Sequence, residues 1–358
     1  MSPRSVGVEE EFLLVEPGTG QPQAMAGTVL REAGPELEAE LQEQQLETNS
    51  RPCQTLDDLH RELRRCRASA AEAAGRAGTQ VAALATSPVP VEPSPVHSER
   101  YEQMSEDYGL TAQEQLTCGC HVHVGITSAE EGVAVLDRIG PWLAPLLALS
   151  GNSPYWQNRD SSYDSFRYQV WGRWPSSGPP GQFGTVQAYR ETIRQMVETG
   201  AIIDPGMVYF NARLSDHYPT IEVRIADVCL RSGDAVLIAG LVRALVETEA
   251  RAWREGRPPL PARTEVLRLA AWRASRSGLH GALLSPLTGK PEQAGAVVTG
   301  LAEHCRDALA DAGDAGAVAE LLAALLGRGN GAAFQREAYH RCGHLPEMIG
   351  RAVDVTGS

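Results

Sequence analysis

Apolar and polar residues alternate along several short segments of the chain, and this period of two is typical of half-buried β-strands. The clearest case is Thr220–Ala226, where an apolar residue follows each polar one. Residues two apart in a strand share a face, so the pattern also predicts which side chains point together. Strands are predicted at residues 6–14, 44–48, 81–85, 118–125, 208–214 and 220–226.

Helical periodicity replaces this alternation between the strands. Residues 56–77 are predicted to form a helix, because Thr55 is a suitable N-cap and Asp57 and Asp58 favour the positive end of the helix dipole. The intervening segment 151–184 is rich in aromatic residues, and we expect it to be irregular but ordered, hence functional. Further helices are predicted at residues 129–149, 185–199, 232–255 and, with interruptions, 264–351.

The order of these elements predicts the fold class. Strands and helices mix over the first part of the chain and only helices follow, which favours an α+β fold with an antiparallel sheet over a β-α-β repeat. We expect a catalytic α+β core over residues 1–256. The mostly helical part 257–358 is expected to pack on it within one structural domain, bracing the sheet or forming a homodimer interface.

The charge and lysine content exclude several functions. A net charge of -13 disfavours a nucleic-acid partner, because phosphate contacts need clustered basic residues. The one lysine, Lys290, precedes Pro291, so the chain lacks a Walker-type phosphate loop. A protein of this sequence that handles phosphates must use arginine, backbone amides and metal.

The N-terminal segment has no apolar signal core, and no later run is expected to be long and apolar enough to span a bilayer. Seven scattered cysteines fit reduced thiols better than a disulfide framework. We therefore expect a cytoplasmic protein with no membrane partner.

The first strand places two carboxylates on one face. Glu9 and Glu11 share that face about 7 Å apart, and like charges so placed repel unless a positive group lies near them. The alternative is a solvated strand face. In the strand 220–226, Glu222 and Arg224 share a face with Ala226, opposite an apolar face. This second polar face fits either a lined cavity or ordinary cross-strand pairing.

The strand 118–125 carries two histidines between glycines. His121 and His123 share one face, whereas Cys118 and Cys120 lie on the other, so the four cannot easily converge on a zinc ion. A satisfied core pair is the alternative for the histidines. Glu47 on its own is a weak candidate, but four carboxylates and a histidine on inward strand faces form a coherent Mg²⁺ site.

These segments resemble the type 2 glutamate–cysteine ligase family, the carboxylate–amine ligases of YbdK type. The similarity extends over residues 6–280, and the ordered set of motifs is far more specific than any single one. After Glu47 the chain departs from the family pattern with Thr48–Pro52, which leaves the amine acceptor open. The matching motifs are Gly7–Phe12, Gln45–Glu47, Cys118–Gly125, Leu147–Pro154, Tyr163–Arg167 and Thr220–Asp227.

The resemblance implies a glutamine-synthetase-like fold whose antiparallel sheet, with flanking helices, forms the floor of a funnel-shaped site. It also implies the use of ATP and of Mg²⁺ or Mn²⁺. By position, Arg224 corresponds to the catalytic arginine at the phosphoryl group, and Glu222 is also catalytic. Arg167 corresponds to a substrate-carboxylate clamp, with Tyr163 and Asn152 shaping its pocket. Arg224 and His123 are the implied nucleotide-binding residues, and the implied metal ligands are Glu9, Glu11, Glu47, His121 and Glu222.

Members of the family phosphorylate a carboxylate, usually the γ-carboxylate of glutamate, and an amine then attacks the acyl-phosphate. The expected partners are therefore a small amino acid and an amine such as cysteine. Two alternatives stay open at this point. One is a phosphotransferase that stops at a phosphorylated product, and the other is a non-catalytic relative that only binds amino acids or nucleotides.

Overall fold

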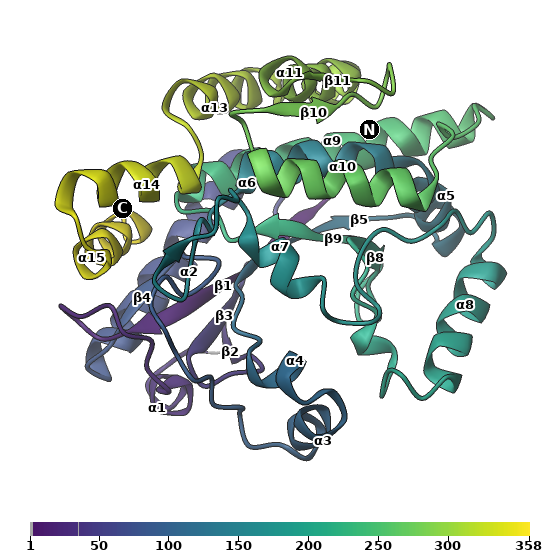
Figure 1. Ribbon diagram of the computed structural model, residues 1–358. Coiled ribbons are helices and arrows are strands. Elements are labelled where there is room, and N and C mark those ends of the chain that lie inside the picture. Colours follow the sequence, from purple (N-terminus) through teal and green to yellow (C-terminus); the bar gives the residue numbers. More distant parts are fainter. Residues whose placement is uncertain (1–2, 35) are drawn as a thin grey trace.

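The computed structural model describes residues 3–34 and 36–358. Its centre is a seven-stranded sheet in the order β2-β3-β1-β5-β9-β8, with β4 beside the end of β1 (Figure 1). Every strand pair in it is antiparallel, as the sequence predicted. The strands are β1 (Val6–Val15), β2 (Leu37–Ala39), β3 (Gln45–Asn49), β4 (Gln80–Ala82), β5 (Gly119–Gly125), β8 (Ala212–Leu214) and β9 (Thr220–Asp227).

The predicted helices are present. In α2 (Leu56–Arg76) the Thr55 side chain accepts a hydrogen bond from the backbone N–H of Asp58, as expected of an N-cap. Three helices before residue 120 escaped prediction, because two of them have only six and four residues and the third is strongly polar, so none shows a clear apolar stripe. The remaining helices are α1 (Ala26–Arg31), α3 (Glu99–Tyr108), α4 (Leu110–Gln113), α5 (Ala129–Ile139), α6 (Leu143–Ser150), α7 (Phe166–Trp171), α8 (Val186–Glu198), α9 (Ser232–Arg254), α10 (Thr264–Ser277), α11 (Ala294–His304), α12 (Arg306–Ala312), α13 (Ala315–Arg328), α14 (Gly331–Cys342) and α15 (Leu345–Thr356).

The aromatic segment and the helical C-terminal part both differ from the expectation. The segment 151–184 is not irregular throughout, because it contains α7 and a small hairpin of β6 (Tyr155–Trp156) and β7 (Arg159–Asp160). Helix α7 begins where the Ser165 hydroxyl accepts from the N–H of Tyr168, a cap that aromatic content alone did not indicate. A second hairpin, β10 (Ala282–Leu284) with β11 (Pro291–Gln293), interrupts the helical C-terminal part.

The run Ala129–Ser150 is long and apolar enough to cross a membrane by length and hydropathy, which corrects the expectation that no run qualifies. In the structure 78% of its most apolar window is buried inside the protein. A turn of 3-10 helix at Gly140–Trp142 divides it into α5 and α6. Both halves pack into the core, which accounts for their apolar composition.

Helices cover the two sides of the sheet differently. The long helix α9 lies along one side, where β1, β5 and β9 contribute apolar residues such as Val122 and Val223 to the main core (Figure 1). Helices α3 and α4 lie on the other side. There a smaller apolar cluster formed by Met104, Trp174, Tyr209 and their neighbours lies over the polar face of the sheet.

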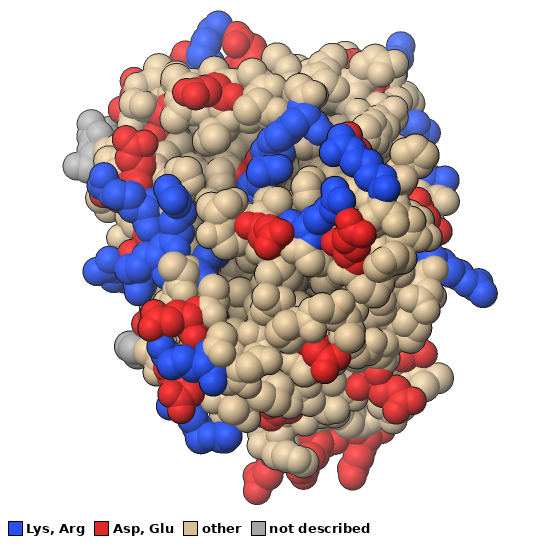
Figure 2. All heavy atoms as spheres, turned by 90° about the vertical axis from the view of Figure 1, so that its left-hand side faces the viewer, with Lys and Arg blue, Asp and Glu red and all other residues tan. Residues whose placement is uncertain are grey.

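Basic and acidic side chains are interspersed on the face of the molecule in Figure 2. Many surface charges pair within one helix, as Arg76 does with Glu72 and Arg351 with Glu347. Exposed pairs of this kind contribute only about 0–1 kcal/mol each. The ion pair that matters most for the fold lies inside.

Glu10 and Arg67 form that internal ion pair, with side chains 0% and 2% exposed. The guanidinium donates to both carboxylate oxygens of Glu10, at 2.6 and 2.9 Å. It also donates to the carbonyl oxygens of Cys229 and Leu230. The contact therefore joins β1, α2 and the segment after β9 on the side of the sheet opposite Glu9 and Glu11.

We expect Arg67→Met to lower the free energy of unfolding by about 3–5 kcal/mol, because it leaves the Glu10 carboxylate buried without its partner. Urea denaturation measures this loss. Arg76→Met on the exposed face of the same helix is the matched control and should change stability by less than about 0.5 kcal/mol. Equal effects of the two substitutions would contradict the structural role of the pair.

Candidate functional site

The register of the sheet brings the predicted polar residues of four strands together. Residues directly opposite in antiparallel strands have Cβ atoms about 4.5–5.5 Å apart on the same face. The polar faces of β1, β3, β5 and β9 thus form one continuous surface. The opposed pairs are Glu11 with Glu47, Glu9 with His121, and His123 with Glu222.

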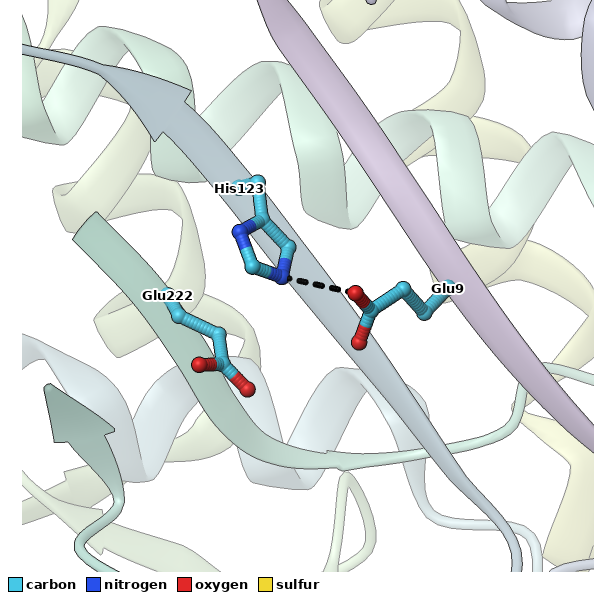
Figure 3. A group of neighbouring side chains, drawn as sticks. All are labelled: Glu9, His123 and Glu222. Atoms are coloured by element: carbon cyan, nitrogen blue, oxygen red, sulfur yellow. Dashed lines mark ion pairs between the residues drawn. The ribbon is translucent and has the colours of Figure 1, made fainter. Parts of the chain in front are cut away.

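Three groups on this surface have the geometry to hold a cation, since their ligand atoms lie within 4.8 Å of one another. Figure 3 shows one of them, in which the His123 imidazole lies between the carboxylates of Glu9 and Glu222. Nε2 of His123 is 3.0 Å from Oε1 of Glu9. Carboxylate oxygens and imidazole nitrogens suit Mg²⁺ and Mn²⁺. The other two groups are Glu9, Glu47 and His121, and Glu11, Glu40 and Glu47.

Glu40 is a candidate ligand that sequence reasoning missed. It follows β2, which pairs with β3 and so brings Glu40 beside Glu11 and Glu47. The one available signal was the alternation of Glu36, Glu38 and Glu40. That pattern is equally typical of an exposed edge strand, so it did not single out Glu40.

Burial and crowding shift the titration of these carboxyl groups. Burial and the negative charge of Glu40 raise the pKa of Glu11 to about 7. Burial and the charges of Glu9 and Glu40 raise the pKa of Glu47 well above its ordinary value. For Glu9, burial is outweighed by hydrogen bonds from His121 and His123, which lower its pKa. The raised pKa values mean that protons on Glu11 and Glu47 can offset part of the negative charge of this surface.

Arginines supply the positive charge at the other end of the surface. Arg224 and Arg213 both pair with Glu222, Arg213 through Nε at 2.8 Å. Burial alone would raise the pKa of Glu222, but these two arginines lower it to about 2. Burial and the charge of Arg224 lower the pKa of His121 to about 4. Its imidazole is therefore neutral at pH 7 and has a lone pair to offer a metal.

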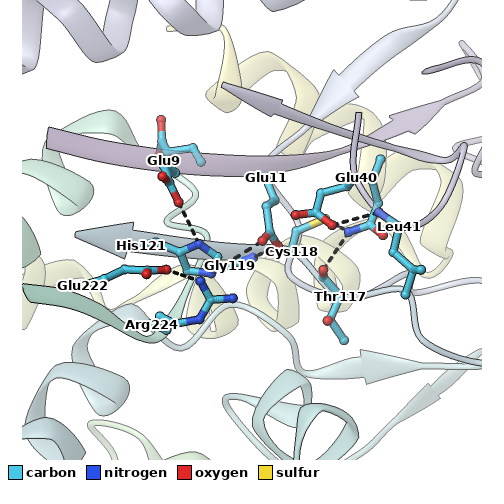
Figure 4. A network of polar contacts seen from close by, with 12 residues as sticks. Glu9, Glu11, Glu40, Leu41, Thr117, Cys118, Gly119, His121, Glu222 and Arg224 are labelled. Atoms are coloured by element: carbon cyan, nitrogen blue, oxygen red, sulfur yellow. Dashed lines mark hydrogen bonds and ion pairs between the residues drawn. The ribbon is translucent and has the colours of Figure 1, made fainter. Parts of the chain in front are cut away.

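A β-bulge in β9 sets the position of Arg224. The register between β5 and β9 shifts by one residue opposite His121. As a result Ile225 and Ala226 both belong to the main core, which corrects the expectation that Ala226 shares the face of Glu222. Bulges commonly redirect a side chain beside an active site, and here Arg224 points toward His121 and Glu222 (Figure 4).

Arg167 also reaches this surface, from α7. Its guanidinium is 1% exposed and lies against β5. A Cβ atom on Gly119 would come within 2.3 Å of Nη2 of Arg167, so any other residue there would displace the guanidinium. Arg167 lies near Glu11, whose pKa its charge lowers, although burial and Glu40 outweigh that effect.

The structure does not bring Asn152 and Tyr163 to the charged surface. The Asn152 amide is fully buried and donates to the carbonyl oxygens of Ala83 and Val228, both at 2.8 Å, while its oxygen accepts from Gln335. The Tyr163 ring packs against Arg276 of α10. His123, implied for the nucleotide, lies in a candidate metal group instead.

Asp227 explains why the segments around Asn152 and Tyr163 matter. Its carboxylate accepts from the Asn152 N–H at 2.9 Å and from the hydroxyls of Ser153 and Ser165 at 2.7 Å. Ser165 caps α7, and Ser153 also accepts from the backbone N–H of Arg167. Buried Asp227 thus fixes the start of the helix that carries Arg167.

Comparisons with known proteins agree with this arrangement. The profile described as glutamate–cysteine ligase family 2 matches residues 5–354. A Streptomyces avermitilis protein provisionally named glutamate–cysteine ligase 2-1 is 54% identical over 359 residues, which are 99% of each chain. A Streptomyces coelicolor protein provisionally named glutamate–cysteine ligase 2 is 52% identical, also over 99% of each chain.

Solved structures show the same fold at low sequence identity. A glutamate–cysteine ligase from Francisella tularensis in complex with AMP has a TM-score of 0.69 at 13% identity, covering 100% of this chain and 90% of the other. A bifunctional glutathione synthetase from Pasteurella multocida has a TM-score of 0.70 at 16% identity, covering 99% and 52%. These neighbours confirm the glutamine-synthetase-like α+β class.

If the group of Glu11, Glu40 and Glu47 binds a divalent cation, its affinity should weaken as the pH falls, because the cation competes with the proton on Glu11. With a pKa of about 7, the apparent affinity for Mg²⁺ should drop about tenfold between pH 8 and pH 6. Calorimetry in buffers of different ionisation enthalpy would measure both the affinity and the protons released. An affinity that stays constant over this range would contradict proton–metal competition at these carboxylates.

Asp227→Asn should lower the free energy of unfolding by at least about 2 kcal/mol, since hydrogen bonds to a charged acceptor contribute about 1.5–3 kcal/mol each. The introduced side-chain amide would also place an N–H donor against groups that now donate to the Asp227 carboxylate. Urea denaturation checks this, with exposed Asp311→Asn as the control. Unchanged stability would show that Asp227 does not hold α7 in place.

Proposed function

On the premise that the chain belongs to glutamate–cysteine ligase family 2 and is an ATP-dependent ligase forming C–N bonds, we propose that it phosphorylates the γ-carboxylate of glutamate. It then joins the acyl group to an amine such as cysteine, and releases ADP and phosphate. The observation that carries this proposal is the convergence of the Glu9–His123–Glu222 group and Arg224 on one sheet face. A site built from metal ligands and arginine replaces the missing phosphate loop.

The ligand groups fit Mg²⁺ or Mn²⁺. Burial, and then repulsion between neighbouring carboxylates, raise the pKa values of Glu11 and Glu47. A divalent cation bound by Glu11 or Glu47 would reduce this repulsion. When bound, the metal would neutralise phosphate oxygens of ATP. Glu9 and Glu47 each belong to two of the three groups, which would let neighbouring cations share them.

Arg224 and Arg167, the two buried arginines of the site, have separate tasks. Arg224 stabilises the negative charge of the transferring phosphoryl group, and its Nε has no hydrogen-bond partner among the described residues. Arg167 binds the carboxylate substrate, for which a planar guanidinium offers paired N–H donors. The aromatic residues on this side, Tyr209 and Trp174 among them, exclude water that would hydrolyse the acyl-phosphate.

The residues after Glu47, where the chain departs from the family pattern, do not identify the amine acceptor. In this chain Thr48 is buried and its hydroxyl donates to the Glu10 carbonyl oxygen, so it belongs to the sheet. Ser50 accepts from the N–H of Val8. These polar residues after Glu47 stabilise β3 beside β1. The acceptor is therefore best identified by a panel of amines.

The direct test is ADP release from Mg-ATP with glutamate, with and without a panel of amines that includes cysteine, and mass detection of the products. Amine-dependent ADP release with a new amide mass would establish the ligase and its acceptor. A stable phosphorylated product without amide would instead indicate a phosphotransferase. No ADP release with glutamate and any amine would refute the proposed donor.

Glu222→Gln should lower turnover by more than about 100-fold while the protein stays folded, because even residues that only orient a metal ligand contribute about 10- to 100-fold. Exposed Glu102→Gln on α3 is the control and should retain full activity. Circular dichroism and thermal unfolding would confirm that both variants fold. Ligation retained by Glu222→Gln would remove Glu222 from the proposed site.

A further inference from the structure

One indole ring lies over both arginines of the proposed site. Trp171, the last residue of α7, has its ring centroid 5.6 Å from the Arg167 guanidinium carbon and 5.9 Å from that of Arg224. Both distances are within the range of an attractive cation–π contact. The two guanidinium groups come from different elements, α7 and β9, and the ring is a contact that they share.

Hydrogen bonds hold the Arg167 guanidinium only weakly, whereas Arg224 pairs with Glu222 through one of its nitrogens. The contacts of Arg167 with the carbonyl oxygens of Ile225 and Arg224 are long, at 3.4 and 3.5 Å. Asp227 is 3.9 Å away. The Nε atoms of Arg167 and Arg224 have no partner among the described residues, although both side chains are buried. The Trp171 ring therefore adds a contact where Arg167 has only long hydrogen bonds and Arg224 has a single side-chain partner.

Trp171 itself packs against other aromatic rings. Its centroid is 4.7 Å from that of Tyr209, which lies 5.5 Å from Trp174. Trp174 in turn meets Tyr108 of α3 edge-on at 5.0 Å. Tyr209 and Trp174 are buried, so this row of four rings forms a fixed support from α3 to the arginines.

We propose that Trp171 is the positioning residue of the site. By its cation–π contacts with Arg167 and Arg224 it holds the two guanidinium groups in place. It leaves the Nε–H of each, and most of the donors of Arg167, available for the carboxylate substrate and the transferring phosphoryl group. A cation–π contact is suited to this task, because it holds an arginine without using its N–H donors. The assignment of these two anionic groups rests on the proposed function, whereas the cation–π contacts themselves do not.

The test compares Trp171→Phe with Trp171→Met. Phenylalanine keeps an aromatic face and methionine keeps apolar volume without one, so a space-filling role would make the two variants alike. We expect Trp171→Phe to remain within about threefold of wild type, and Trp171→Met to raise KM for glutamate and lower kcat by about tenfold each, near the upper range of a desolvated cation–π contact. Trp272→Met, 45% exposed on α10, is the control and should behave as wild type.

A second measurement does not depend on turnover. In protein labelled with ¹⁵N-arginine, the Nε–H signals of Arg167 and Arg224, assigned from their lysine variants, should be shifted by the indole ring current. The shift should largely persist in Trp171→Phe and disappear in Trp171→Met. If the wild-type protein forms no amide, the proposed ligase reaction is refuted. The Nε–H signals would still show whether the Trp171 ring contacts Arg167 and Arg224. Equal kinetics of the Phe and Met variants would overturn the positioning role. Nε–H signals that neither substitution shifts would overturn it as well.

Discussion

Crowding of carboxylates on one face of an antiparallel sheet is the constraint on which the site depends. Glu9, Glu11, Glu47 and Glu222 come from three strands, and Glu40 adds a fifth charge from the chain after β2. Such crowding is costly in a buried setting. The protein offsets it at one end with Arg224 and Arg213, and at the other it holds protons on Glu11 and Glu47. This arrangement gathers on one face of the sheet the oxygen ligands that divalent cations prefer.

Several features that look unrelated in the sequence serve this arrangement. The bulge in β9 turns Arg224 toward Glu222 while two consecutive residues enter the core. Gly119 leaves room for the Arg167 guanidinium against β5. Asp227 ties the loop before α7 to the end of β9. Each one places a positive group beside the acidic surface, so the counter-charges are as firmly built into the fold as the carboxylates.

The sequence predicted this surface to a useful degree, because strand alternation assigns faces without knowledge of the neighbours. The faces of β1 and β5 followed from alternation alone, and pairing then joined them. What escaped prediction depends on contacts between distant segments. Glu40 acquires its role only when β2 pairs with β3, and Ala226 changes face only because of the bulge. Asn152 matched a family motif, yet its amide bonds to the backbone of Ala83 and Val228, which the motif alone could not reveal.

The buried arginines show how structural and functional roles separate in physical terms. Arg67 and Arg167 are almost equally buried, at 2% and 1% exposed. Arg67 spends its donors on Glu10 and two carbonyl oxygens at 2.6–3.0 Å. Arg167 has two long contacts, an unpartnered Nε and an indole ring whose centroid is 5.6 Å from its guanidinium carbon. Burying unsatisfied donors costs free energy, and the contact with an aromatic ring offsets part of that cost. The use of donors, and not burial, therefore distinguishes Arg67, whose donors the fold uses, from Arg167, whose donors the fold leaves largely unused.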